Sequence, residues 1–335
     1  MFYNPAMAGD RDLAVAFAAA WHLRRATPAS GWDGTAATGV RGLRLLHESG
    51  AFDRFVLTEG NDTAWTVLAT NAARYTGATA LRQDARSPPG RATFDYVDVD
   101  PYGSPIPFIP AGLEAVRPGG VLVVTATDMM VLAGVQAGAA ERRYGSRPIR
   151  GRLGPEGGLR ILLAYLARAA RSAGLRLRPL LSYVRDHHVR AYVEVSREVT
   201  PDVPEPVGTI TPGTWAGPAL GEGGPYGPFW LGPLFDAALV GSMEVPTSAA
   251  TPEETGRFLA RLKEEVSADE PFYYEANVLA KRLQLPRPPS YAAVRRELLA
   301  LGYRVARTHA RPEGFRTDAP RRTVEEIARA LGGRG

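Results

Sequence analysis

A short apolar segment in the first third of this 335-residue chain is followed by two acids, two prolines and a tyrosine. Residues 94–97, Phe-Asp-Tyr-Val, alternate and are β-prone, so we expect a strand there. The strand leads into the rigid sequence Asp98-Val99-Asp100-Pro101-Tyr102-Gly103-Ser104-Pro105. A carboxylate at this point can accept a hydrogen bond from an amino group, and a tyrosine ring can stack on a flat base. The alternative is a capping acid in a tight turn, and these eight residues alone do not separate the two interpretations.

The carboxyl end of a strand is where ligands bind in open α/β sheets. Asp100-Pro101-Tyr102-Gly103 also resembles the Asp/Asn-Pro-Pro-Tyr motif of methyltransferases that modify exocyclic amines of bases. On the first of the two interpretations the stretch is a site for an amino group, with Asp100 as the acceptor and Tyr102 as the stacking ring; the rest of the chain has to decide between the two.

A small-residue segment, Asp33 to Gly39, opens a predicted helix at 40–49. Glycines let the backbone approach a ligand closely, and a helix N-terminus supplies free N–H groups. Such turns are common, however, and the preceding segment 28–32 is a poor strand, so on its own this signal is weak.

Two further acids follow predicted strands. Glu59 comes after the strand at 54–58 and lies 26 residues beyond Asp33, close to the offset at which an acid binds ribose hydroxyls. Asp84 follows the strand at 78–81, where a carboxylate can reach an adenine amino group. The alternative for Glu59 is a helix-capping or surface acid.

The elements around these positions alternate between strand and helix. Helices are also expected at 14–25, 62–75 and 156–173, and a buried strand at 121–126. Two final strands, 175–184 and 189–196, are joined by so short a link that they must be antiparallel. Alternating elements followed by such a hairpin distinguish the class I methyltransferase sheet from the nicotinamide Rossmann sheet. We predict an α/β, Rossmann-like fold of class I methyltransferase type.

The chain is long enough for two domains. The first is predicted at 1–200, followed at 201–250 by a linker or insertion. Residues 201–235 hold eight prolines and eight glycines and are expected to form neither strand nor helix, with Trp215, Tyr226, Phe229 and Trp230 pinning them to a surface. The second domain is predicted at 251–335. Its helices, a strand at 303–308 and a wing-like loop at 311–320 resemble an α+β winged-helix module.

Charge and residue composition favour some classes of protein and exclude others. Between Lys281 and Arg322 eleven Lys/Arg face three acids, which indicates a polyanion-facing surface, although a solvated basic face would show the same excess. The chain has no cysteine, which excludes disulfides, thiolate zinc sites and a cysteine nucleophile, and its five histidines are scattered, so we expect no metal. It has neither an 18-residue apolar run nor the charged and apolar regions of a signal peptide, so we expect a cytoplasmic protein with no membrane contact.

Many stretches, taken in order from residue 2 to about 330, resemble the tRNA (guanosine-26-N2)-dimethyltransferase family. The matching residues are Phe2-Tyr3-Asn4-Pro5, Arg11-Asp12, Ala37-Thr38-Gly39-Val40-Arg41, the stretch Asp98 to Pro105, Val116-Arg117-Pro118-Gly119-Gly120, Thr125-Ala126-Thr127-Asp128, Leu132-Ala133-Gly134-Val135, Arg160-Ile161-Leu162-Leu163, Leu180-Leu181-Ser182-Tyr183, Gly227 to Leu234, Gly302-Tyr303, Thr308-His309 and Gly314 to Pro320.

The resemblance implies that S-adenosylmethionine is the methyl donor and tRNA the substrate. The residues it places around the donor are Arg11, Arg41, Glu59, Asp84 and Ala85, to which the segment at 33–39 adds Asp33 and Gly39. Those expected at the target guanine are Asp100, Phe2, Pro101 and Tyr102. The arginines of the basic C-terminal domain expected to contact tRNA are Arg295, Arg296, Arg307 and Arg316.

Three features depart from the family's pattern. Glu59 stands where the family usually has Asp, a change that keeps the ribose acceptor. The cysteines that carry zinc in some members are absent. The chain begins at the Phe2-Tyr3-Asn4-Pro5 motif, without the segment that usually precedes it.

The leading hypothesis is therefore a monomeric enzyme that methylates the exocyclic N2 of guanosine 26 in tRNA. One alternative is an amino-methyltransferase of another base, such as adenine N6 in DNA or RNA, which the chemistry of Asp100 permits. A second is a non-catalytic tRNA-binding protein, which the acids of the donor pocket argue against. A nicotinamide dehydrogenase is disfavoured by the terminal hairpin.

Overall fold

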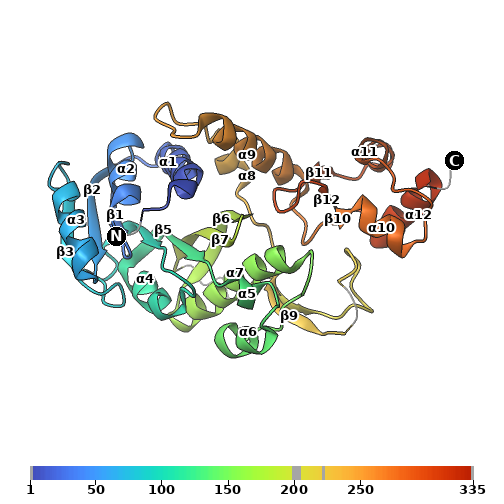
Figure 1. The fold of residues 1–335 in the computed structure, drawn as a ribbon, viewed down its shortest axis with the longest axis horizontal. Helices are drawn as coiled ribbons and strands as arrows, with labels where there is room; N and C mark the ends of the chain where they lie inside the picture. The colour runs from blue at the N-terminus through green and yellow to red at the C-terminus, as the bar shows by residue number, and fades with distance from the viewer. Residues whose placement is uncertain (1–2, 198–204, 221–222, 333–335) are drawn as a thin grey trace.

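The computed structural model describes residues 3–197, 205–220 and 223–332. Its centre is a seven-stranded sheet in the order β3-β2-β1-β4-β5-β7-β6 (Figure 1). Strands β1 to β5 run parallel, β7 is antiparallel to β5, and β6 is antiparallel to β7. The sheet and its terminal hairpin confirm the predicted class I methyltransferase architecture.

The strands of this sheet are β1 (Ala29–Asp33), β2 (Phe52–Glu59), β3 (Ala78–Arg82), β4 (Phe94–Val99), β5 (Val116–Ala126), β6 (Arg176–Arg185) and β7 (His188–Ser196). The helices are α1 (Ala8–His22), α2 (Val40–Glu48), α3 (Asp62–Ala72), α4 (Ile109–Ala115), α5 (Met129–Leu132), α6 (Ala137–Tyr144), α7 (Gly154–Ser172), α8 (Ala237–Ser242), α9 (Pro252–Glu265), α10 (Ala276–Arg282), α11 (Tyr291–Ala300) and α12 (Arg321–Gly332). Short 3-10 turns occupy Pro5–Met7, Ile106–Phe108 and Val266–Ala268.

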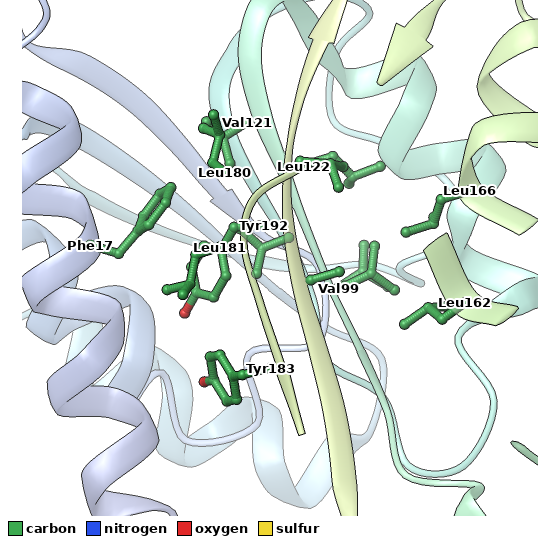
Figure 2. Packing of buried hydrophobic residues seen from close by; sticks show 14 of the residues in the cluster. Phe17, Val99, Val121, Leu122, Leu162, Leu166, Leu180, Leu181, Tyr183 and Tyr192 are labelled. Atoms are coloured by element: carbon green, nitrogen blue, oxygen red, sulfur yellow. The ribbon is translucent and has the colours of Figure 1, made fainter. Parts of the chain in front are cut away.

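Helices cover both faces of the sheet, because its central strands are apolar on both sides. Figure 2 shows Phe17 of α1 on one side of the strands and Leu162 and Leu166 of α7 on the other. Helix α2 packs against α1, and α4 and α5 pack against α7. Both faces of the sheet are therefore covered, and its loops emerge at its edges.

The first strand shows where the sequence-based prediction was wrong. Residues 28–32 looked like a poor strand, yet β1 is completely buried between β2 and β4. Small residues are required there because of the neighbours: a Cβ on Gly31 would lie only 2.3 Å from the ring of Phe55. Ser30 donates from its backbone N–H and its hydroxyl to Asp95 of β4. Tertiary packing thus overrides the low β-propensity of this segment.

The Pro/Gly-rich segment at 201–235 was also predicted wrongly. It contains an antiparallel pair, β8 (Val207–Ile210) and β9 (Tyr226–Trp230). A two-stranded ladder leaves one side of each strand unpaired, so prolines are tolerated in it. The predicted aromatic anchors are confirmed: Phe229 and Trp230 are buried, and Trp215 and Tyr226 pack against the same core.

The C-terminal unit has its own apolar cluster, which begins at Tyr274 and runs to Ile327. It is built on a small antiparallel sheet in the order β10-β12-β11, formed by β10 (Tyr274–Glu275), β11 (Val305–Arg307) and β12 (Gly314–Thr317). Part of the predicted wing-like loop at 311–320 is therefore strand β12. Helix α9 was predicted to open the C-terminal domain. It packs instead with α1 and α8, in the apolar core around the central sheet. The predicted boundaries at 200 and 250 stay predictions.

A buried ionic cluster joins the C-terminal unit to the central sheet. Arg316 of β12 donates to Glu156 of α7 at 2.8 Å and to Glu265 of α9 at 2.5 Å, and all three side chains are fully buried. His309 accepts at Nε2 from the backbone N–H of Val184, so its Nδ1 carries the proton and donates to Glu265 at 2.6 Å. Arg316 is thus at the centre of the connection between the two parts.

No helix in the described parts of the chain is long and apolar enough to cross a membrane.

Candidate functional site

The carboxyl ends of the parallel strands place the predicted acids at one edge of the sheet. Asp33 ends β1, Glu59 ends β2, and Asp100 directly follows β4. Asp33 is in register with Asp98 of β4, and the backbone N–H of Gly34 donates to the Asp98 carbonyl at 2.9 Å. This is the edge at which ligands bind in open α/β sheets.

The loop between β1 and α2 closes over Glu59. The backbone N–H of Ala37 donates to one Glu59 carboxylate oxygen at 2.9 Å, and that of Asn61 donates to the other at 2.8 Å. Gly39 has a φ of 79° and caps α2, and a Cβ there would lie 2.6 Å from Leu68. Only glycine fits this turn, which aims the free N–H groups of α2 at the edge of the sheet.

Asp84 and Ala85 lie beside this loop. A Cβ built on Gly60, next to Glu59, would lie 3.8 Å from the Cα of Asp84. A Cβ built on Gly34 would lie 3.6 Å from the Cβ of Ala85. The Asp84 carboxylate is half-exposed and bound by Arg86, whose hydrogen bonds lower the pKa of Asp84 to about 2. Asp84 is therefore ionised at any working pH.

Asp100 is held in place by its backbone and by two guanidinium groups. Its N–H donates to the hydroxyl of Thr35 at 2.9 Å, while its carboxylate accepts from Arg41 at 2.5 Å and lies 3.9 Å from Arg190. Burial raises the pKa of Asp100, but Arg41 and Arg190 outweigh burial and hold that pKa below its ordinary value. Asp100 is thus an ionised carboxylate beside two guanidinium groups.

The residues after Asp100 divide into a fixed and an exposed part. Pro101 is buried, whereas the Tyr102 side chain is 71% exposed. Gly103 and Thr127 connect the loop to the end of β5. The Gly103 N–H donates to the Thr127 hydroxyl at 2.7 Å, and the Thr127 N–H donates to the Gly103 carbonyl at 3.0 Å. Tyr102 is therefore presented on a rigid loop beside the carboxylate.

Asp98 and Arg190 belong to the site, although neither was assigned a role from the sequence. Arg190 of β7 is fully buried and donates to Asp98, to the Thr125 hydroxyl and to the Tyr192 hydroxyl. One Asp98 oxygen and one Arg41 nitrogen, Nη1, are buried without a hydrogen-bond partner in the described residues. An arginine alternating with apolar residues in a buried hairpin strand was the available signal for Arg190.

A family model described as N2,N2-dimethylguanosine tRNA methyltransferase matches residues 1–207 and 220–329. The chain belongs to this family.

Individual relatives from this family match nearly the whole of this chain. The tRNA (guanine(26)-N(2))-dimethyltransferase of Pyrococcus furiosus is 32% identical over 98% of this chain and 92% of its own length. That of Aeropyrum pernix is 33% identical over all of this chain and 90% of its own length. The structure of Trm1 from Pyrococcus horikoshii with S-adenosyl-L-methionine has a TM-score of 0.85 and 28% identity, and the alignment covers 97% of this chain and 94% of that one.

The N-terminal motif of this tRNA methyltransferase reaches the same edge of the sheet. Arg11 donates to the Asn4 carbonyl at 3.2 Å and to the Tyr3 hydroxyl at 3.3 Å, and its guanidinium lies over the Tyr3 ring. Burial, together with repulsion from Arg41, lowers the pKa of Arg11. The structure therefore brings Arg11 near Arg41, while Phe2 lies outside the described residues.

The four arginines expected to contact tRNA have different surroundings. Arg295 and Arg296 are exposed on α11, as an RNA contact requires. Arg307 is half-buried and stacked over the Tyr291 ring. The prediction for Arg316 was wrong, because its side chain is fully buried in the ionic cluster. Charge in the sequence does not distinguish a phosphate contact from a buried ion pair.

Among the described residues, no three His, Asp or Glu side chains gather as ligands of a metal ion.

Asp33 gives the site a measurable pH dependence. Burial and the neighbouring Asp98 carboxylate raise the pKa of Asp33 to about 8. In the unfolded chain Asp33 loses its proton near pH 4, so between about pH 4 and pH 8 this residue makes folding less favourable as pH rises. Asp33→Asn removes this pH-dependent contribution to the free energy of folding. We expect the melting temperature of the variant, relative to wild type, to rise from pH 5 to pH 8 in thermal unfolding without ligand.

The matched control is Asp53→Asn, which changes an exposed acid near the opposite end of β2. Its melting temperature relative to wild type should stay level across the same pH range. An equally level difference for Asp33→Asn would show that Asp33 is ionised throughout.

Proposed function

We propose that this edge of the sheet is the active site of the enzyme, with Asp100 as the group that receives the proton of the target amine. The reaction is that of the family, the transfer of methyl groups from S-adenosylmethionine to N2 of guanosine 26 in tRNA, giving N2-methyl- and N2,N2-dimethylguanosine. The observation that carries the proposal for Asp100 is its position, an ionised carboxylate between the β1–α2 loop and the exposed Tyr102 ring.

The chemistry explains why a carboxylate is needed. The lone pair of guanine N2 is delocalised into the ring, so the nitrogen is a poor nucleophile. As N2 bonds to the methyl carbon, the carbon–sulfur bond breaks, its electron pair stays on sulfur, and positive charge develops on N2. Asp100 stabilises that charge and takes the N2 proton, which leaves methylated guanine and the thioether product. A second transfer repeats the same steps on the monomethylated amine.

Arg41 lies where it could pair both with Asp100 and with the carboxylate of the methyl donor. It holds Asp100 through one nitrogen, while its Nη1 is buried without a partner in the described residues. A guanidinium nitrogen of this kind fits an anionic ligand, and S-adenosylmethionine carries a carboxylate. Pairing between that carboxylate and Arg41 would weaken the hold of Arg41 on Asp100 and leave Asp100 free to receive the amine.

The other residues expected around the donor fit its remaining parts. Glu59 would accept from the ribose hydroxyls and Asp84 from the adenine amino group, with Ala85 against the ring. Gly39 and Asp33 shape the turn that the methionine portion would approach, and Arg11 adds positive charge beside Arg41.

The target guanine would stack on Tyr102 after leaving the folded RNA, as enzymes acting on bases require. The carbonyl of Pro101 would provide a second acceptor beside Asp100, and Phe2 would complete the clamp. Exposed arginines of α11, Arg295 and Arg296, would hold the tRNA backbone. We further propose that the enzyme acts in the cytoplasm as a monomer.

Labelled S-adenosylmethionine and unmodified tRNA transcripts test the function. A transcript with guanosine at position 26 should be labelled, and one with adenosine there should not. Nucleoside analysis should give N2-methyl- and N2,N2-dimethylguanosine. Equal labelling of the two transcripts would exclude guanosine 26 as the target and return adenine chemistry to consideration.

A further inference from the structure

A cleft of about 240 Å³ lies between the two parts of the molecule, away from Asp100. One wall is the loop before α7, residues 149–153, and a second is the segment 218–220. The third wall is formed by Tyr273, by β10 and by Val278, Leu279 and Arg282 of α10. Any ligand seated in it would therefore contact both parts at once.

The charge of the cleft is positive. Arg150, Arg152 and Arg282 line it, and Glu275 is the one carboxylate among its lining residues. Arg152 pairs with Glu275, and Arg282 pairs with Glu325, which lies outside the lining. Arg150 is exposed, and its side chain has no ion pair or hydrogen bond in the described part of the chain. Such a surface attracts phosphate groups.

The cleft also has apolar lining residues. Leu153, Leu220 and Leu279 contribute to its surface, and Val278 is 39% exposed beside them. Arginines beside an apolar surface suit a nucleotide, whose phosphate pairs with guanidinium and whose base or ribose covers the apolar side chains.

A series of contacts connects one wall of the cleft to the loop that carries Asp100. Asp128, just beyond β5, accepts from the Tyr144 hydroxyl at 2.8 Å, and that hydroxyl contacts Ser104 at 3.0 Å. Helix α5 follows Asp128 and leads to Gly134, whose backbone packs so closely on Ile149 that a Cβ there would lie 2.8 Å from the Ile149 carbonyl. The wall of the cleft at 149–153 is thus connected to the Asp100 loop.

We propose that this cleft binds a second nucleotide of the tRNA, distinct from the target guanosine, with its phosphate at Arg150 and Arg282. The proposal rests on the proposed function, because it places the same substrate on a second site. A nucleotide held between the two parts sets the register of the RNA relative to Asp100 and so contributes to the choice of the base that is methylated.

The first experiment uses Arg150→Ala and the double variant Arg150→Ala/Arg282→Ala. We expect the KM for tRNA to rise about tenfold per arginine, because each provides a charge-assisted contact. The slope of log KM against log salt should fall by about one per arginine. The kcat and the KM for S-adenosylmethionine should not change, and Arg150→Lys should recover part of the loss. Arg257→Ala, an exposed arginine on α9, is the control.

The second experiment replaces Val278 with the photoreactive residue p-benzoylphenylalanine and maps cross-links to tRNA. We expect one cluster of cross-linked nucleotides, lost in the double variant and unaffected by free guanosine monophosphate at millimolar concentration. An unchanged KM for tRNA in the double variant would overturn the proposal, as would cross-links abolished by the mononucleotide. Failure of the proposed function appears differently, as a wild-type enzyme that binds tRNA without methylating it.

Discussion

Asp100→Ala is expected to lower kcat for tRNA methylation by about 10²–10⁴-fold, because the variant has no group to receive the N2 proton or to stabilise the charge on N2. Single-turnover transfer of labelled methyl groups to a guanosine-26 transcript measures this loss. The backbone N–H of Asp100, which the substitution keeps, donates to the Thr35 hydroxyl in the β1–α2 loop, so the loop should survive the change. Binding of S-adenosylmethionine, followed by calorimetry, should stay within a few-fold of wild type.

Asp100→Asn separates charge from shape. The amide oxygen still accepts a hydrogen bond from Arg41, but it cannot take a proton, so the defect in kcat should be nearly as large as that of Asp100→Ala. Removing the charge also leaves the buried Arg41 less well paired, which a small drop in melting temperature would report. Asp53→Ala, which alters an exposed acid near the other end of β2, is the activity control. Near-normal kcat in Asp100→Asn would show that Asp100 positions the base and does not receive its proton.

The sequence predicted Glu59, Asp84 and Asp100 because each lies at or just beyond the end of a predicted strand, and parallel strands end at one edge. It did not predict how these residues pair. Arg41 was assigned to the donor and Asp100 to the base, yet the two form an ion pair at 2.5 Å. Arg190 reaches Asp98 from β7, which is distant in the chain from β4. Such partnerships depend on strand order across the sheet, which local patterns do not specify.

The fold was predictable where elements carry their own signal. The terminal hairpin has a short link and strong alternation, so strand direction follows from the sequence. Strand β1 has no such signal, because its glycine and small residues are selected by the ring of Phe55 and the carboxylate of Asp95. In the same way, β9 is a strand because Phe229 is buried against the central core, in spite of the prolines around it.

Arg316→Ala is expected to destabilise the protein by about 3–5 kcal/mol, the usual cost of leaving a buried charge without its partner. Arg316 donates to Glu156 and Glu265 and also to the Glu270 carbonyl at 2.6 Å, with no exposure to solvent. Its loss leaves the buried carboxylates of Glu156 and Glu265 with Arg160 and His309 as their remaining side-chain ionic partners in the described residues. Urea unfolding should show the change in the free energy of unfolding, and because the cluster is buried, added salt should not reduce it.

The control for this measurement is Arg304→Ala, which removes an exposed arginine of the same C-terminal unit. Arg304 pairs with Asp318 and Glu270, but its side chain is 55% exposed, so the expected loss is below about 1 kcal/mol. If Arg316 contacted tRNA instead, its removal would raise the KM for tRNA while leaving the unfolding free energy close to that of Arg304→Ala. The burial of Arg316 predicts the reverse: a large loss of stability, with a normal KM for tRNA in the fraction that remains folded.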